Sequence, residues 1–290
     1  MDNEIPRSLK QYCYMGESKM IDLKFGLFWS GTDLSYLRYL TFVSLRKFHP
    51  DSTIELYISE GFKSDGFKWG NEKQDFQSKE FDQVVSLEDL ATIGVDIKRI
   101  DLFSKYPPNY QSDFFRWWWI KNNGGFYLDA DQIILKSFES IGRDYDFIYS
   151  LYEAPSCGIY TPVGAIGGSK SSEIVKWIDD ILPKYYDSNC YNSLGPFMLK
   201  SVIKTRKWRD RMYNSGSELF YPVKDSCFVP ALYCNLPESE KIMDRINNAY
   251  SLHWYGGHPA SQGFNKRYTE KKANSSLDLI SCILREKGII

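Results

Sequence analysis

An apolar helix that meets an apolar strand across a pair of glycines is the strongest constraint on how this chain folds. Ser112 is a suitable helix N-cap, and Phe114–Ile120 reads FFRWWWI, which is apolar nearly all round. The helix is expected to stop at Gly124–Gly125, because a left-handed C-cap needs glycine. Phe126–Leu135, which reads FYLDADQIIL, then predicts a central strand. Both elements must be buried, which requires a large shared core.

The N-terminal part has the pattern of a β-α-β unit. Lys24–Ser30 is a short apolar run that ends at a turn, and Leu34–Phe48 has apolar residues at the spacing of an amphipathic helix. Thr53–Ile58 is β-branched and alternating, which predicts a second strand. Short strands separated by helices favour an α/β fold with a mainly parallel central sheet flanked by helices.

The rest of the chain predicts additions to this sheet. Gly61–Glu80 is polar and irregular and is expected to be a surface insertion. Phe228–Pro230 and Ser251–Tyr255 are expected to be late strands, and Ser275–Glu286 a C-terminal helix. A length of 290 residues suits one large α/β domain, so residues 1–290 are expected to form a single domain.

Composition excludes several classes of function. The chain has 36 basic and 37 acidic residues and no polybasic run, which argues against binding to nucleic acid or to an anionic membrane surface. No two of the six cysteines form a C-x-x-C pair, so a zinc site is not expected. The N-terminus has no apolar signal region and no window approaches about 20 apolar residues, so we expect a cytoplasmic protein without a transmembrane segment.

Two aspartates in the predicted central strand are the main candidates for chemistry. Asp129 and Asp131 are two residues apart, so in a strand both carboxylates would point to the same face. Two such like charges resist ionisation unless a cation lies beside them, and oxygen ligands suit Mg²⁺ or Mn²⁺. A lone D-x-D motif also occurs by chance in surface loops, but here apolar residues flank it on both sides.

Upstream, Asp113 and Arg116 are three residues apart and share one face of the predicted helix. An arginine in a nearly apolar helix is unfavourable unless it is paired or bound to a ligand. It could pair internally with Asp113, or both groups could face the same ligand as Asp129 and Asp131, since only a short glycine turn joins helix and strand.

These motifs together resemble the signature of glycosyltransferase family 32, the α-mannosyl and α-galactosyl transferases, and of the related clostridial glucosylating toxins. The family pattern is S-D-x-x-R, a spacer and G-G-x-Y-x-D-x-D, and Ser112–Arg116 with Gly124–Asp131 matches every position. The resemblance implies a GT-A type nucleotide-sugar-binding fold with C-terminal helical additions. It also implies a nucleotide-sugar-binding part at about 20–140 and an acceptor-side part at about 141–290.

The same resemblance implies a set of site residues. Asp131 would bind the metal directly, and Asp129 would contact the metal or the ribose. The Phe28–Trp29 pair at the end of the first strand resembles the family's base-stacking element, and His253–Trp254 resembles its C-terminal element beside the metal or diphosphate, with His258 as a weaker alternative. The implied catalytic residues are Asp113, Arg116, Asp129 and Asp131. The implied donor-binding residues are Phe28, Trp29, Asp113, Arg116, Tyr127, Asp129, His253 and Trp254. The implied metal ligands are Asp129, Asp131 and His253.

The expected activity is transfer of a hexose from a nucleoside diphosphate sugar to a glycan or another hydroxyl acceptor, with Mn²⁺ or Mg²⁺. A UDP-sugar is the first choice and a GDP-sugar the second, and the resemblance implies retention of anomeric configuration. Two alternatives remain at the level of sequence. One is a haloacid-dehalogenase-like phosphatase with Asp129 as nucleophile, since such enzymes also have an apolar strand ending in D-x-D. The other is a non-catalytic nucleotide-sugar binder.

Overall fold

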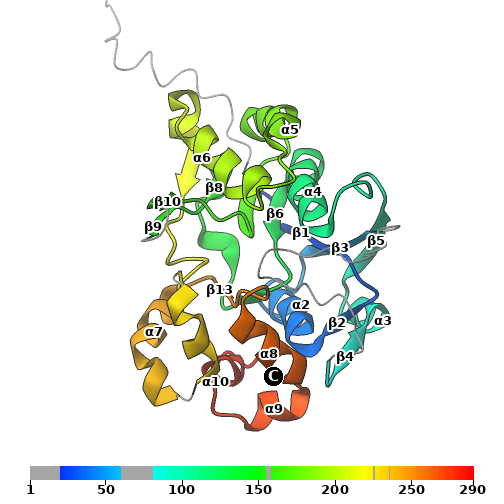
Figure 1. Ribbon diagram of the computed structural model, residues 1–290, viewed down its shortest axis with the longest axis vertical. Helices are drawn as coiled ribbons and strands as arrows, with labels where there is room; N and C mark the ends of the chain where they lie inside the picture. Colours follow the sequence, from blue (N-terminus) through cyan, green and yellow to red (C-terminus); the bar gives the residue numbers. More distant parts are fainter. Residues whose placement is uncertain (1–19, 60–80, 155–157, 225, 235) are drawn as a thin grey trace, which may run out of the picture.

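The computed structural model describes residues 20–59, 81–154, 158–224, 226–234 and 236–290. Within them, a seven-stranded sheet forms the centre of the molecule (Figure 1). Its strands, in spatial order, are β12 (Met212–Asn214), β8 (Phe147–Tyr149), β11 (Ala165–Gly168), β6 (Gly125–Leu128), β1 (Lys24–Trp29), β3 (Thr53–Ser59) and β5 (Asp96–Ile100). The insertion expected at 61–80 lies outside the described residues.

The sheet is mixed and mostly parallel, as the sequence predicted. Strand β1 pairs in parallel with both β3 and β6, β3 pairs in parallel with β5, and β8 pairs in parallel with β12. Strand β11 is antiparallel to both of its neighbours, β6 and β8. In the described part of the chain, three two-stranded sheets accompany the main one: β2 (Asp33–Ser35) with β4 (Val84–Ser86), β7 (Gln132–Ile134) with β13 (Ser251–His253), and β9 (Tyr152–Ala154) with β10 (Gly158–Tyr160).

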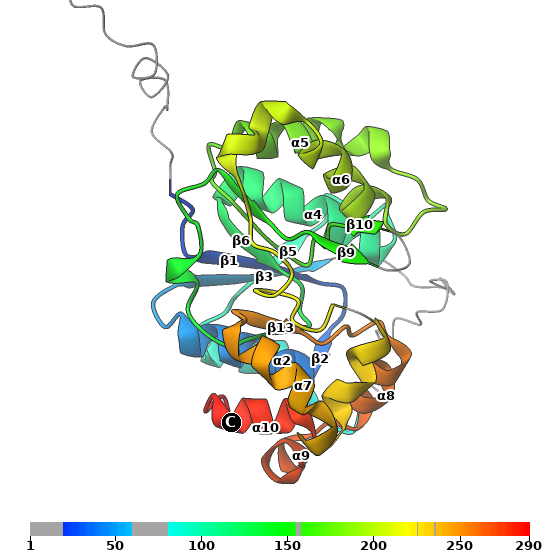
Figure 2. The same ribbon diagram turned by 90° about the vertical axis from the view of Figure 1, so that its left-hand side faces the viewer.

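Helices cover both faces of the sheet, which makes a three-layered α/β structure (Figure 2). One face carries α4 (Pro108–Asn123), α5 (Glu173–Tyr185) and α6 (Met198–Ile203), and the other carries α2 (Tyr36–Phe48) and the C-terminal helices. The remaining helices are α3 (Leu87–Thr92), α7 (Leu236–Asn248), α8 (Pro259–Arg267), α9 (Glu270–Ser275), α10 (Leu279–Glu286), and the short turns η3 (Phe138–Ser140), η4 (Ser193–Phe197), η5 (Arg206–Arg211) and η6 (Ser226–Tyr233).

Helix α4 is buried as its composition predicted, but it begins earlier than the sequence suggested. Pro107 is the N-cap and Pro108 the first helical residue, whereas Ser112 lies inside the helix and does not cap it. A proline at the first helical position has no N–H that would be left unpaired, so proline suits this position. The proline pair therefore begins the helix, whereas the sequence had suggested a helix that starts after it. The end was predicted correctly, since Gly124 is the C-cap with a φ of 70° and Gly125 follows with a φ of 103°.

The predicted strand across Phe126–Leu135 is two strands, and this is a correction. Strand β6 ends at Leu128, the chain bends through Asp129–Asp131, and β7 leaves the central sheet to pair with β13. Thr41 of α2 holds the bend by donating a hydrogen bond from Oγ1 to the carbonyl of Ala130 at 3.1 Å. The two aspartates therefore lie in a bend between two sheets, and the alternation of side chains in a strand does not explain why they converge.

Two other element predictions have a mixed outcome. The strand expected at Phe228–Pro230 is wrong, because these residues belong to the 3-10 helix η6. The strand expected at Ser251–Tyr255 is confirmed as β13, which ends at His253. The C-terminal helix is confirmed as α10, with α9 before it.

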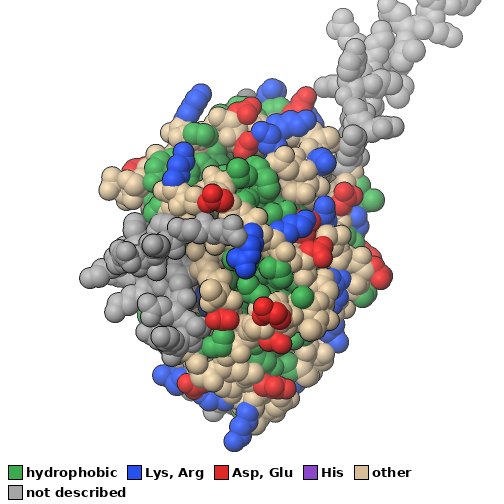
Figure 3. Space-filling view, turned by 90° about the vertical axis from the view of Figure 1, so that its right-hand side faces the viewer, with side chains coloured by type: hydrophobic (Ala, Val, Ile, Leu, Met, Phe, Trp, Pro, Cys, Tyr) green, Lys and Arg blue, Asp and Glu red, His purple; other side chains and the backbone are tan. Residues whose placement is uncertain are grey.

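In the described part of the chain, none of the helices combines the length and the apolar character needed to cross a bilayer. The face in Figure 3 shows Lys and Arg interspersed with Asp and Glu, which agrees with the nearly balanced charge of the sequence.

Candidate active site

A buried polar network joins helix α4 to the end of strand β6. Arg116 Nη2 lies 3.0 Å from Asp113 Oδ1, 3.6 Å from Asp129 Oδ1 and 3.2 Å from Ser112 Oγ. The Tyr127 hydroxyl lies 2.7 Å from Ser112 Oγ and donates to Asp129 Oδ1, also at 2.7 Å. The Arg116 guanidinium lies over the Tyr127 ring, 4.8 Å from its centroid. Arg116 therefore pairs with Asp113, as one reading of the sequence held, and also faces Asp129.

Burial changes the electrostatics of this network. Asp113 and Arg116 are 7% and 5% exposed. Burial raises the pKa of Asp113 to about 6, an effect that Arg116 opposes and Asp129 reinforces. Burial alone would lower the pKa of Arg116, but Tyr127, Asp113 and Asp129 raise it above its ordinary value. Arg116 thus keeps its charge at a site where an uncompensated cation would be strongly unfavourable.

Asp129 is held in place by a close approach of the backbone on its other side. Its N–H donates to the carbonyl of Gly164 at 2.7 Å. A Cβ at Gly164 would lie only 2.3 Å from Asp129 Oδ2, so only glycine leaves room for this carboxylate. With Tyr127 on one oxygen and Gly164 beside the other, Asp129 has a fixed orientation.

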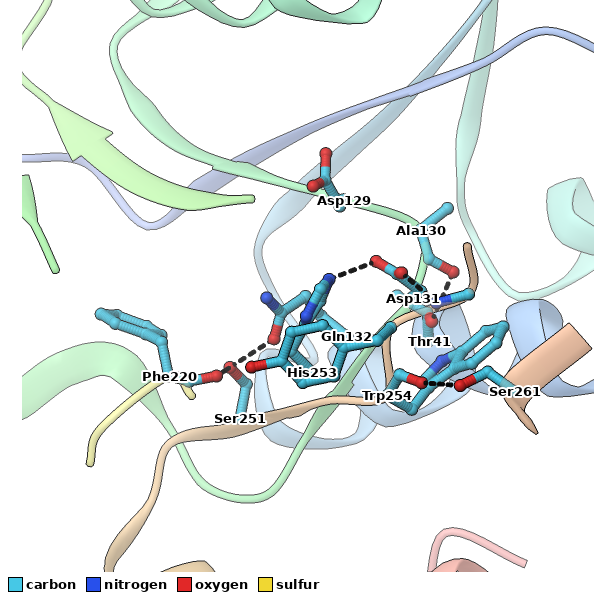
Figure 4. Close-up of polar contacts among 12 residues, drawn as sticks. Thr41, Asp129, Ala130, Asp131, Gln132, Phe220, Ser251, His253, Trp254 and Ser261 are labelled. Atoms are coloured by element: carbon cyan, nitrogen blue, oxygen red, sulfur yellow. Dashed lines mark hydrogen bonds and ion pairs between the residues drawn. The ribbon is translucent and has the colours of Figure 1, made fainter. Parts of the chain in front are cut away.

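Asp131 meets His253 because β7 and β13 are paired, as Figure 4 shows. His253 Nε2 lies 3.0 Å from Asp131 Oδ1, and the N–H of Gly256 donates to Asp131 Oδ2 at 2.7 Å. The Trp254 N–H donates to the Asp131 carbonyl at 3.0 Å and extends the pairing. Burial would raise the pKa of Asp131, but His253, Gly256 and Arg38 together lower it to about 2. This carboxylate is therefore ionised.

Asp129, Asp131 and His253 suggest a divalent metal site. Each offers one ligand atom, and these atoms lie within 4.8 Å of one another. Metal–ligand distances of about 2.1 Å place the ligands of one ion about 3–4 Å apart, so small side-chain rotations would complete the arrangement. Carboxylate oxygens suit Mg²⁺ and Mn²⁺ alike, and the imidazole nitrogen favours Mn²⁺ as the softer of the two. The residues present therefore fit a divalent cation.

Two tryptophans and an arginine lie beside this group. The guanidinium of Arg38 lies 4.8 Å from the centroid of Trp29 and 5.2 Å from that of Trp254. Trp29 is half-buried at the end of β1 and donates from Nε1 to the Asp33 carbonyl at 2.9 Å, whereas Trp254 is fully buried. The structure thus brings Trp29, Trp254, Asp131 and His253 to one side of the bend.

Phe28 lies elsewhere. It is 6% exposed and packs against Phe115 in the core between the sheet and α4, with ring centroids 5.3 Å apart. Side chains alternate along a strand, so Phe28 and Trp29 point to opposite faces of β1. His258, the weaker alternative to His253, accepts a hydrogen bond at Nδ1 from the Ala260 N–H and caps α8.

Arg38, Gly164 and Gly256 had not been singled out from the sequence. Gly164 and Gly256 act through the absence of a side chain next to Asp129 and Arg38, which no local pattern reveals. Arg38 did carry a signal, because a cation in the first turn of a helix opposes the helix dipole.

The comparisons with known proteins agree with this geometry. Residues 38–148 match the family model described as "Glycosyltransferase sugar-binding region containing DXD motif". The matched segment includes the bend with Asp129 and Asp131 and the helix with Asp113 and Arg116. This match decides against the phosphatase alternative. A search of curated proteins found no match.

Solved structures of similar shape have low sequence identity. "PaToxG Glycosyltransferase" is 17% identical with a TM-score of 0.47, over 97% of this chain and 94% of that one. The apo-form glycosyltransferase GlyE of Streptococcus pneumoniae TIGR4 is 13% identical with a TM-score of 0.49, over 93% of this chain and 61% of that one. A glycosyltransferase involved in glycosylation of the major capsid of PBCV-1 is 10% identical with a TM-score of 0.44, over 84% of this chain and 99% of that one.

The family match and the bend at 129–131 lead to the same assignment. The matched segment supplies Asp129 and Asp131, and β13 adds His253 from outside it. Residues 38–148 of the chain form a glycosyltransferase sugar-binding region of the DXD-containing type.

Proposed function

We propose that the chain transfers a hexose from a nucleoside diphosphate sugar to a hydroxyl group of a glycan or another acceptor, with Mn²⁺ or Mg²⁺ bound. A UDP-sugar is the first choice and a GDP-sugar the second. The observation that carries the proposal is the meeting of Asp129, Asp131 and His253 next to the buried Asp113–Arg116 pair. One half of this arrangement suits a metal and a diphosphate, and the other suits sugar hydroxyls.

Asp131 and His253 would hold the cation, and Asp129 would be shared between the cation and the ribose. A divalent cation there offsets the negative charge that develops on the leaving diphosphate. Asp131 is ionised and already oriented by the Gly256 N–H, so it binds a cation without reorganising. His253 Nε2, which donates to Asp131 Oδ1 without the ion, would lose this proton to bind the cation.

Asp113 and Arg116 would position the sugar ring. Arg116 is held by Ser112, Tyr127 and Asp129, and Asp113 is held by its ion pair with Arg116. A preorganised acceptor and donor of this kind can hold sugar hydroxyls so that the anomeric carbon faces the incoming nucleophile. Trp29, half-buried at the end of β1, would stack on the base, and Tyr127 would pack near the ribose.

The acceptor is proposed to approach from the segments after residue 140, within a single domain that spans the chain. Gly195 lies beside Asp113, since an added Cβ there would be 3.6 Å from Asp113 Oδ1, and Gly164 lies against Asp129. We also propose retention of anomeric configuration. In that reaction the bond from the anomeric carbon to the diphosphate oxygen breaks, a bond to the acceptor oxygen forms on the same face, and the proton of the acceptor hydroxyl passes to the leaving diphosphate oxygen.

Replacement of the metal ligand tests this function. Asp131→Ala should abolish turnover of the donor found by screening UDP- and GDP-sugars with Mn²⁺, because the leaving diphosphate loses its cation. Asp210→Ala, at an exposed position in η5, is the control and should keep full activity. Product formation is measured by chromatography, with melting temperature as the check on folding. Full activity of Asp131→Ala, together with full activity of the wild type in EDTA, would disprove the metal hypothesis.

A further inference from the structure

Arg38 lies where the rules of helix formation disfavour a cation. It is the third residue of α2, after the N-cap Ser35, and its own N–H donates to Ser35 Oγ at 3.3 Å. The first turn of α2 contains no acidic residue to balance it. The positive end of a helix dipole and a guanidinium together concentrate positive charge, which favours a bound anion. A residue that breaks a local rule in this way often belongs to a functional site.

The position of the guanidinium is fixed by two aromatic rings. Its central carbon lies over the Trp29 ring, 4.8 Å from the centroid, and over the Trp254 ring, 5.2 Å from that centroid. A guanidinium over an indole ring is held there by the cation–π attraction, and the N–H groups at the edge of its plane can still bind other groups. The half-buried Arg38 is therefore restrained by both indoles.

This edge lies next to the proposed metal site. A Cβ at Gly256 would come within 2.8 Å of Arg38 Nη2, and the N–H of the same glycine donates to Asp131 Oδ2 at 2.7 Å. The positive charge of Arg38 also helps to keep the Asp131 carboxylate ionised. Trp254 follows the metal ligand His253 directly in the chain. Arg38 thus lies between the proposed base-stacking residue and the proposed metal ligands.

We propose that Arg38 binds the diphosphate of the donor and of the leaving nucleoside diphosphate, as a fixed positive charge next to the metal. The inference rests on the proposed function, because it requires the base to stack on Trp29 and the metal to bind at Asp131. A diphosphate that reaches from one to the other passes the guanidinium. The planar fork of an arginine can contact two phosphate oxygens at once, which a lysine cannot.

The experiment compares wild type with Arg38→Met, Arg38→Lys and the control Lys47→Gln, an exposed cation on the same helix. Titration calorimetry with Mn²⁺ present measures binding of UDP, uridine and inorganic pyrophosphate, and a separate titration measures Mn²⁺ alone. Arg38→Met should bind UDP and pyrophosphate about 10- to 100-fold more weakly, the range for loss of a charge-assisted contact. The affinity of Arg38→Met for uridine should change much less. The affinities of Arg38→Lys for UDP and pyrophosphate should lie between those of wild type and Arg38→Met. Lys47→Gln should behave as wild type.

The same data separate this inference from competing roles. If Arg38 only balanced the charge of Asp131, Arg38→Met would change the affinity for Mn²⁺ but not the ratio of UDP affinity to uridine affinity. A ratio that is unchanged from wild type would therefore overturn the inference. If Arg38 only held Trp29 in place, uridine and UDP would weaken equally, which also overturns it. If the wild type binds neither UDP nor, in one further titration, GDP, the result contradicts the proposed function instead. Melting temperatures of all variants, measured without ligand, show whether each is folded.

Discussion

Gly164 shows how one residue without a side chain can set the position of a functional group. Asp129 Oδ2 takes up the space where a side chain would begin, because it would lie only 2.3 Å from a Cβ added at Gly164. Asp129 receives a hydrogen bond from Tyr127 on its other oxygen, and its N–H is bound to the Gly164 carbonyl. The carboxylate cannot move aside without breaking one of these contacts.

Gly164→Ala is therefore expected to displace the Asp129 carboxylate and lower kcat/KM on the order of 100-fold, the effect of moving a positioned group by about 1 Å. Gly164 has no left-handed φ, so alanine can adopt its backbone and the fold should persist. The control is Gly263→Ala, where the nearest atom to an added Cβ is Arg267 Nη2 at 3.6 Å, an ordinary contact. Donor turnover and melting temperature are measured for both. Equal activity of the two variants would show that the orientation of Asp129 does not matter.

At the scale of elements, the sequence predicted those whose pattern is local. The apolar helix α4, the glycine pair that ends it, and the β-α-β unit formed by β1, α2 and β3 follow from residue periodicity and from turn chemistry. The first turn of α4 was missed because the two prolines at 107–108 were interpreted as a break. A proline is equally suited to the first position of a helix.

The break between β6 and β7 could not be predicted from local pattern. Residues 126–135 are apolar on both sides of the two aspartates, so periodicity shows one strand. What divides it is a partner 119 residues away in the chain, since Ser251 pairs with Ile134 and donates to the side chain of Gln132. Pairing over such a separation is set by the whole fold.

The candidate site was predictable to the extent that its residues lie close together in sequence. Asp113, Arg116, Asp129 and Asp131 fall within one motif, and the motif identified them. His253 was found only through resemblance to a family. Arg38 was not found, because its role depends on contacts with Trp29 and Trp254, which only the fold brings close to it.

At the scale of the whole molecule, His49 links one helical layer to the sheet. It is 3% exposed, its Nε2 accepts a hydrogen bond from the Phe138 N–H at 3.3 Å, and its ring lies against Phe25 and Phe138 with centroids 4.6 Å and 5.3 Å away. Burial, reinforced by the nearby Arg143, lowers the pKa of His49 to about 4. The folded protein therefore keeps this imidazole neutral.

The sign of the pH effect follows from this lowered pKa. Between the unfolded value of about 6.5 and the folded value of about 4, the unfolded chain binds more protons, so stability falls as pH falls through this window. The loss attributable to His49 is at most about 3 kcal/mol. His49→Gln should lose less stability than wild type between pH 7 and pH 4.5, and His258→Gln is the control for loss of an imidazole elsewhere. Urea denaturation at pH 7 and pH 4.5 measures the free energy of unfolding of wild type and both variants. An equal loss of stability in all three proteins would contradict the lowered pKa of His49.

The central claim is that one divalent ion binds at the bend between the two sheets. Anomalous diffraction from crystals grown with Mn²⁺ and UDP tests it most directly, because manganese is located by its own scattering. The account predicts a single anomalous peak within about 2.3 Å of a ligand atom of Asp131 and of His253, with Asp129 beside it and the diphosphate of UDP bound to the ion. A UDP molecule bound elsewhere, or an anomalous peak away from Asp131 and His253, would contradict the account.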